Sequence, residues 1–305
     1  MRVLLGITLA LSAAACGATI NGPWQGKLAP LHEACDEGVA AACFDLGAAH
    51  DRGDGAAKDP ERAAKFYRLA CTAGSMPGCA NLATMLEQGD GVPRADTEAV
   101  ALYQRACEKK SARACHNLAR MIAGGRGAPR DEARADALTE KACDLGQALD
   151  CEGLGEKKAR GPTPDLAAAA TLYRKACDLD APLGCQRLGA MLAEGRGVAA
   201  DPLQASGLFH RALPRIVAAC EGGAPAMCVL AGSMIDQGQG VGADRARALL
   251  LFRKACAAGS AGGCAAAGAR VEATDRAEAA ALYQKACDGG SAPGCSGRDR
   301  LGKAP

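Results

Sequence analysis

Cysteine spacing constrains this chain more than any other feature. Sixteen of its 17 cysteines form eight pairs in which seven residues separate the two partners. Successive first cysteines lie 31 to 43 residues apart, and four of the seven intervals are 36 residues. This period is typical of an array of helix-turn-helix repeats. The pairs are Cys35-Cys43, Cys71-Cys79, Cys107-Cys115, Cys143-Cys151, Cys177-Cys185, Cys220-Cys228, Cys256-Cys264 and Cys287-Cys295.

Residues around the cysteines predict two helices in each repeat. Ala99, Tyr103 and Ala106 stand eight, four and one positions before Cys107, and later repeats have a similar small-large-small pattern. These positions share one helical face, so the first helix is expected to be amphipathic. An aspartate twelve residues before the first cysteine suits an N-cap, and a G-x-G turn precedes it. The aspartates are Asp59, Asp131, Asp165, Asp244 and Asp275. The second cysteine is expected to open the second helix, which gives an all-α chain of about sixteen helices.

Two antiparallel helices joined by so short a segment can bring the paired cysteines within disulfide distance. Metal thiolate sites favour a spacing of two to four residues, which does not occur among these pairs. The C-x-x-C redox motif and the C-x-x-C-H haem motif are also absent from the sequence. Structural disulfides are therefore favoured over metal-binding or catalytic cysteines, and no cofactor or metal is predicted.

The N-terminus is typical of an exported lipoprotein. Residues 1–15 combine Arg2, a short apolar stretch and three alanines, as in a signal peptide. Cys16 follows the small residues, where a bacterial lipoprotein signal places its lipidated cysteine, and residues 16–27 would form a tether. Gly17 favours the outer over the inner membrane as the address. The alternative is ordinary secretion with Cys16 as an incidental thiol. The net charge of +2, with both signs mixed, argues against a nucleic-acid partner.

Three recurring motifs carry a family resemblance. They are A-x-x-L-Y-x-x-A-C at residues 99–107, G-C-x-x-L-G at 184–189 and G-x-G-V-x-x-D at 195–201. The chain resembles the Sel-one-like repeat family, relatives of tetratricopeptide repeats, from about residue 28 to 300, leaving a tail at 301–305. Its paired cysteines are similar to those of the cysteine-rich Helicobacter branch. This resemblance implies an α/α superhelical solenoid in which each cysteine pair is disulfide-bonded across its turn.

The resemblance also implies two competing functions. Most members of the family are adaptors that hold a protein or peptide in a concave groove, whereas members of the cysteine-rich branch have been described as penicillin-binding proteins with slow β-lactamase activity. No serine here has the S-x-x-K context of a serine β-lactamase. The four histidines are not clustered in sequence, and each is expected on a helix surface. We interpret the chain as a scaffold more than an enzyme; a β-lactam- or peptidoglycan-fragment-binding protein with slow β-lactamase activity is the alternative, and a purely structural envelope component is a further one.

A ligand groove is expected on the helix opened by the second cysteine. The residue two positions after that cysteine is Asp45, Asn81, Asn117 or Arg187 in four of the repeats. Such side chains could bind an extended peptide backbone or a carboxylate. Later repeats have small or apolar residues there, which favours a ligand near the N-terminal half. Seven extra residues, Pro214 to Cys220, are expected to lengthen one helix, with a kink at Pro214.

Overall fold

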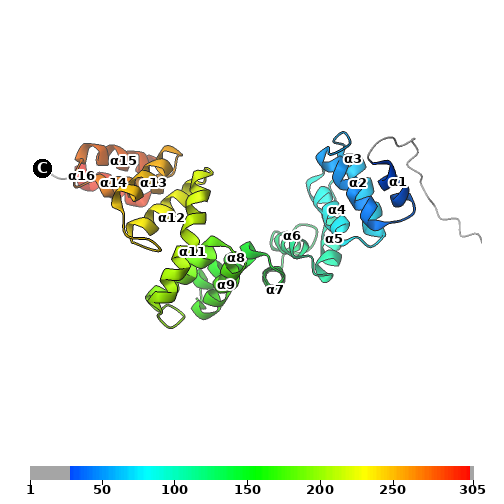
Figure 1. Ribbon diagram of the computed structural model, residues 1–305, viewed down its shortest axis with the longest axis horizontal. Helices are drawn as coiled ribbons and strands as arrows, with labels where there is room; N and C mark the ends of the chain where they lie inside the picture. The colour runs from blue at the N-terminus through cyan, green and yellow to red at the C-terminus, as the bar shows by residue number, and fades with distance from the viewer. Residues whose placement is uncertain (1–27, 303–305) are drawn as a thin grey trace, which may run out of the picture. The chain divides into compact units, whose positions relative to one another are not determined.

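The computed structural model describes residues 28–302, and this part of the chain contains sixteen α-helices and no strands (Figure 1). The chain divides into two compact units, residues 1–106 and 107–305, and the division falls within α5. The proposed signal peptide, Cys16 and the tether lie outside the described residues, as do residues 303–305 of the tail. The helices are α1 (Ala29–Asp36), α2 (Ala40–Arg52), α3 (Pro60–Thr72), α4 (Met76–Gln88), α5 (Asp96–Glu108), α6 (Ala112–Ala123), α7 (Glu132–Asp144), α8 (Ala148–Arg160), α9 (Leu166–Asp178), α10 (Pro182–Glu194), α11 (Pro202–Glu221), α12 (Pro225–Asp236), α13 (Arg245–Ala257), α14 (Ala261–Val271), α15 (Arg276–Asp288) and α16 (Ala292–Gly302).

Capping residues set where the helices begin. Each predicted aspartate cap is confirmed; for example, Asp59 Oδ1 accepts the backbone N–H of Arg62 at 3.0 Å. The same bond is made by Asp131, Asp165, Asp201, Asp244 and Asp275. The second helices begin earlier than predicted, about three residues before the second cysteine. Four of them have a serine N-cap that the sequence analysis missed, namely Ser75, Ser111, Ser260 and Ser291.

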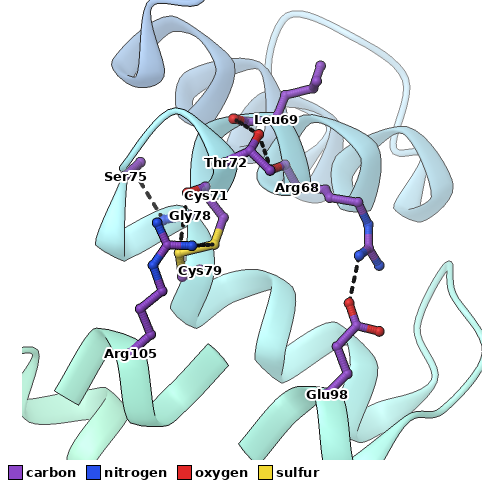
Figure 2. The surroundings of a disulfide bond; sticks show 9 residues. All are labelled: Arg68, Leu69, Cys71, Thr72, Ser75, Gly78, Cys79, Glu98 and Arg105. Carbon is purple, nitrogen blue, oxygen red and sulfur yellow. Dashed lines mark hydrogen bonds and ion pairs between the residues drawn. A yellow bond between two sulfur atoms is a disulfide. The ribbon is translucent and has the colours of Figure 1, made fainter. Parts of the chain in front are cut away.

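All eight predicted disulfides are confirmed, with Cα atoms 4.4 to 4.8 Å apart. Each bond joins the last turn of one helix to the first turn of the next, as Figure 2 shows for Cys71 and Cys79. In four repeats a glycine precedes the second cysteine and packs tightly on the preceding helix; a Cβ on Gly78, for example, would lie 2.8 Å from the Cβ of Ala70. The chain-entropy model gives about 2.5 kcal/mol for a loop this short.

The small-large-small stripe forms the core. Ala63, Tyr67 and Ala70 of α3 are almost completely buried. The Tyr67 ring lies so close to α2 that a Cβ on Gly47 would be 2.6 Å from it. Rings of later repeats lie against Gly155, Gly189, Gly232 and Gly268 in the same way. The aromatic side chain therefore fills the space between successive repeats.

The G-x-G turns do more than end a helix. Gly89 caps α4 with φ 74°, and Gly91 has φ 67°. A Cβ on Gly91 would also lie 2.2 Å from the backbone carbonyl carbon of Pro60 at the start of α3. A Cβ on Gly197 would likewise lie 2.6 Å from the backbone carbonyl carbon of Leu166 at the start of α9. The second glycine thus packs a loop directly onto helix backbone.

The insertion lengthens α11 to 20 residues, and the helix continues through Pro214. Leu213 occupies the place of the first cysteine and is buried, so the apolar face keeps its register. Arg211 donates to Asp180 Oδ1 at 2.7 Å, and the inserted Arg215 donates to the Asp180 carbonyl. These bonds secure Asp180, which has φ 65° at a position where most repeats have glycine.

Candidate functional site

The even-numbered helices of successive repeats contact one another within each unit: α2 contacts α4, α8 contacts α10, α12 contacts α14, and α14 contacts α16. We call the face that these helices form the inner face. The predicted groove residues all lie on even-numbered helices, with Asp45 exposed and Asn81, Asn117 and Arg187 half-buried. Asp45 and Asn81 belong to one compact unit, and Asn117 and Arg187 to the other.

Of these four residues, Arg187 lines a hollow between α8 and α10. Its Nη2 is 3.1 Å from Glu156 Oε2 on the preceding even-numbered helix. The same carboxylate accepts from Arg160 Nε at 2.6 Å and from the Tyr173 hydroxyl at 3.2 Å. Burial and the nearby Glu156 carboxylate raise the pKa of Tyr173 to about 12, so the phenol stays a donor at neutral pH.

Two adjoining hollows flank this cluster, and we call them together the α8–α10 groove. One has a volume of about 200 Å³ and is lined by Glu156, Arg160, Tyr173, Gln186, Arg187 and Arg196, among others. The other, about 410 Å³, shares Glu156, Tyr173 and Arg187 and adds Leu149, Gly153 and Leu183. Leu149 is 70% exposed and forms an apolar edge of the second hollow.

Gly153 lines this groove and has no side chain to fill it. It occupies the same position in its repeat as Arg187 does in the next, and a Cβ placed on it would meet no atom within 4 Å. Beside it, Glu152 accepts the backbone N–H of Gly184 at 2.7 Å, which ties α8 to α10. Burial raises the pKa of Glu152. The groove thus combines an apolar lip, open backbone and charged groups of both signs.

A buried carboxylate next to this groove was missed by the sequence analysis. Asp150 is 7% exposed, and its Oδ1 lies 2.7 Å from His116 Nδ1 on α6. Its other oxygen, Oδ2, is buried without a hydrogen-bond partner. The sequence feature that could have revealed this carboxylate is its position directly before the second cysteine, where the other repeats have glycine, alanine or methionine.

The expectation that every histidine lies on a surface is wrong for two of the four. His32 and His50 are buried, because both rings pack against Phe66 of the following repeat. His116 is half-buried and His210 is exposed, as expected for surface residues.

Neither a membrane span nor a metal centre is found in the described part of the chain. No helix among residues 28–302 is long and apolar enough to cross a bilayer. In the same residues, His, Cys, Asp and Glu side chains do not gather in groups of three or more that could hold a metal ion.

Sequence comparison settles the family. The Sel1 repeat model matches residues 40–75, 77–111, 112–147, 151–180, 182–213, 224–260 and 264–291, which is more than half of the chain. The chain belongs to the Sel1 repeat family. The disulfide pattern of this Sel1 repeat protein fits the cysteine-rich branch that the sequence resembles. No curated protein matches the chain.

Solved structures confirm the solenoid fold. A protective antigen present in uropathogenic Escherichia coli strains, which displays an SLR fold, has a TM-score of 0.74 and 24% identity over 89% of this chain. The match spans only 58% of that protein. A Sel1 repeat protein from Oxalobacter formigenes has a TM-score of 0.60 and 23% identity over 90% of this chain and 79% of its own. At this level of identity the likeness concerns the fold alone.

Proposed function

We propose that this Sel1 repeat protein is an exported scaffold that holds an extended peptide segment of a cell-envelope partner in the α8–α10 groove. The observation that carries the proposal is the hollow around Gly153, where open helix backbone lies beside exposed Leu149 and the Arg187–Glu156 pair. Peptide grooves combine apolar contacts with a few placed polar groups in this way. Eight disulfides favour an oxidising compartment such as the periplasm or the cell exterior.

Charge favours a peptide with an acidic side chain or a free C-terminal carboxylate at one end of the groove. In the smaller hollow, Arg160, Arg187 and Arg196 are among the lining residues, and Glu156 is the one carboxylate of that lining. Arg196 also lies 3.3 Å from Glu194, which does not line the hollow, and Glu152 lies on the other side of Arg187. Guanidinium groups bind carboxylates in a planar, bidentate manner, so this end is suited to an acidic group.

Selection from a displayed peptide library tests the groove. Peptides that bind the wild-type protein are expected to lose at least about tenfold in affinity for Gly153→Leu, because the new side chain fills the hollow. The fold tolerates this change, since a leucine at an open helical position gains about 1 kcal/mol in helix propensity.

Gly207→Leu on α11 is the matched control. Gly207 is also an exposed helical glycine whose Cβ would meet no atom within 4 Å, but it does not line the groove. The control should bind the selected peptides like wild type. Equal affinity for wild type and Gly153→Leu would place the peptide site elsewhere.

Lipid anchoring at Cys16 is the second part of the proposal. It is supported by the small residues before Cys16 and by the fact that every other cysteine has a disulfide partner. Intact mass of protein purified from membranes should show a diacylated N-terminal Cys16 and no free thiols. Recovery of an unprocessed N-terminus would contradict export as a lipoprotein.

A further inference from the structure

Two neighbouring repeats have leucine at positions where the other repeats do not. One leucine stands two residues after the first cysteine, at Leu145 and Leu179, and another stands two residues before the second cysteine, at Leu149 and Leu183. We call these four residues the leucine strip. The same two positions in the other six repeats hold only small residues, prolines or charged residues. Because six repeats fold without leucine there, the repeat architecture does not explain the leucine strip.

The leucine strip is partly open to solvent. Leu149 is 70% exposed and Leu179 is 40% exposed, whereas Leu145 and Leu183 are half-buried. The strip also bridges its two repeats, since a Cβ on Gly146 would lie 3.9 Å from Leu179 Cδ2. The turns of these two repeats therefore present apolar surface that the described part of the chain leaves uncovered.

The leucine strip continues into the α8–α10 groove. Leu149 and Leu183, from the first turns of α8 and α10, line the larger hollow together with Arg187. Arg187 also lines the smaller hollow, which lies toward the C-terminal ends of the same helices and includes Arg160 and Arg196. One end of the groove is thus apolar and the other is cationic, and a single ligand can contact both.

Helix geometry gives the separation of the two ends. Along the axis of α10, Arg187 lies about 6 Å from Leu183, and Met191 of the smaller hollow lies about 12 Å from it. An extended peptide spans about 3.3 Å per residue, so the groups that contact the two ends are roughly two to four residues apart in the ligand. Gly153 of α8 lets the peptide backbone approach the helix between them.

We propose that the peptide in the α8–α10 groove has a large apolar residue roughly two to four residues from an acidic side chain or a C-terminal carboxylate. The apolar side chain lies on the leucine strip, and the carboxylate binds at Arg187 and the neighbouring guanidinium groups. This inference rests on the proposed peptide groove and adds the chemical class of its ligand. An acidic peptide without the apolar residue, or an apolar peptide without the carboxylate, satisfies only one end.

Sequencing of the peptides selected on the wild-type protein tests the spacing. They should be enriched in leucine, isoleucine, methionine or phenylalanine at about two to four positions from aspartate, glutamate or the C-terminus. A synthetic copy of an enriched peptide should bind at least about tenfold more weakly when serine replaces its apolar residue. Three glycines inserted between the apolar and the acidic residue should have a similar effect. Selected peptides without this pairing would overturn the proposal.

Variants of the protein test the leucine strip. Leu149→Ser shortens an exposed side chain, so it should keep the unfolding temperature of wild type and bind the selected peptides about fivefold more weakly. Leu250→Ser is the matched control, since Leu250 of α13 is 65% exposed and lines neither hollow, and it should bind like wild type. Serine in place of the peptide's apolar residue should cost less affinity in Leu149→Ser than in wild type, because both changes remove the same contact.

The same measurements distinguish the leucine strip from the groove itself. If Gly153→Leu weakens binding and Leu149→Ser does not, the peptide site stands and the leucine strip is not part of it. If neither variant weakens binding, the peptide site lies elsewhere and both proposals fail.

Discussion

At the scale of single residues, Asp150 of α8 is a carboxylate whose hydrogen bonding is incomplete. It is buried, and one oxygen has no partner, while the other depends on His116. Residues at this position in the other repeats are glycine, alanine or methionine, so a carboxylate is not needed for the fold. Proteins keep such costly groups mainly where they serve a function.

The two partners should therefore respond differently to truncation. His116→Ala leaves the buried carboxylate without any partner and should cost about 1–3 kcal/mol. Asp150→Ala removes the unsatisfied group together with the bond and should be close to neutral or stabilising. Chemical unfolding of both variants, compared with wild type, measures this asymmetry. If both variants lose the same free energy of unfolding, the His116–Asp150 pair contributes net stability, and the argument that Asp150 is kept for a function fails.

Residues whose role is local could be predicted from the sequence, and residues that depend on distant neighbours could not. Asp59 caps its own helix, so its spacing from the next helix was sufficient. His50 was wrongly expected on the surface because its burial depends on Phe66, which comes from the next repeat. The His116–Asp150 bond joins residues 34 positions apart, and the repeat pattern gives no signal for it.

At the scale of elements, the G-x-G loop after a second helix packs against the start of the first helix of the same repeat, as Gly91 packs against Pro60. Gly91→Ala should destabilise the first compact unit by about 3 kcal/mol or more, because its Cβ would lie 2.2 Å from the Pro60 backbone in addition to the strain of φ 67°. Thermal unfolding gives the measure.

Gly38→Ala is the control for this prediction. Gly38 has φ 87°, but a Cβ there would meet nothing within 4 Å, so only the backbone strain of about 1–2 kcal/mol applies. A similar loss in both variants would mean that positive φ, and not the close approach to Pro60, explains the glycine at position 91.

The short helix α1 should be sensitive to acid. Burial lowers the pKa of His32 from 6.5, the nearby His50 and Arg62 lower it further, and Asp36 opposes them. The unfolded segment then binds a proton more readily than the folded one, so stability is unaffected above pH 6.5 and falls as the pH drops below it. Hydrogen exchange of residues 29–52, corrected for intrinsic rates, should accelerate between pH 6.5 and 5. If hydrogen exchange in His32→Phe does not accelerate over this pH range, the effect comes from the His32 side chain. If it accelerates as much as in wild type, His32 is not the cause.

Element types were more predictable than element contacts. The cysteine period, the aspartate caps and the G-x-G turns all report on one repeat at a time, and they predicted the helices well. The start of each second helix was placed too late because the sequence analysis overlooked caps such as Ser75. Of the charged residues that line the α8–α10 groove, only Arg187 was among the predicted groove residues, since its partner Glu156 lies in the preceding repeat and at a different helical position.

At the scale of the whole molecule, disulfides compensate for a core of small side chains. Aromatic residues make up only 3% of the chain, and many of the buried core residues are alanines. Figure 2 shows how a disulfide is embedded in its surroundings: Arg105 of α5 approaches Cys71 Sγ, and Arg68 of α3 pairs with Glu98 of α5 at 2.6 Å. A cross-link within each repeat also limits how far local opening can spread.

Stability in such an array is close to a sum of repeat and nearest-neighbour contributions. Replacing Cys177 and Cys185 by alanine removes about 2.5 kcal/mol of cross-link stabilisation from an interior repeat, which packs on α8 and α11 as well as on itself. The same change at Cys287 and Cys295 affects a terminal repeat with fewer neighbours. Hydrogen exchange should therefore rise across α8 to α11 in the first variant and only in α14 to α16 in the second. A uniform rise along the whole second unit would instead mean that its repeats unfold together, and that each disulfide stabilises all of them.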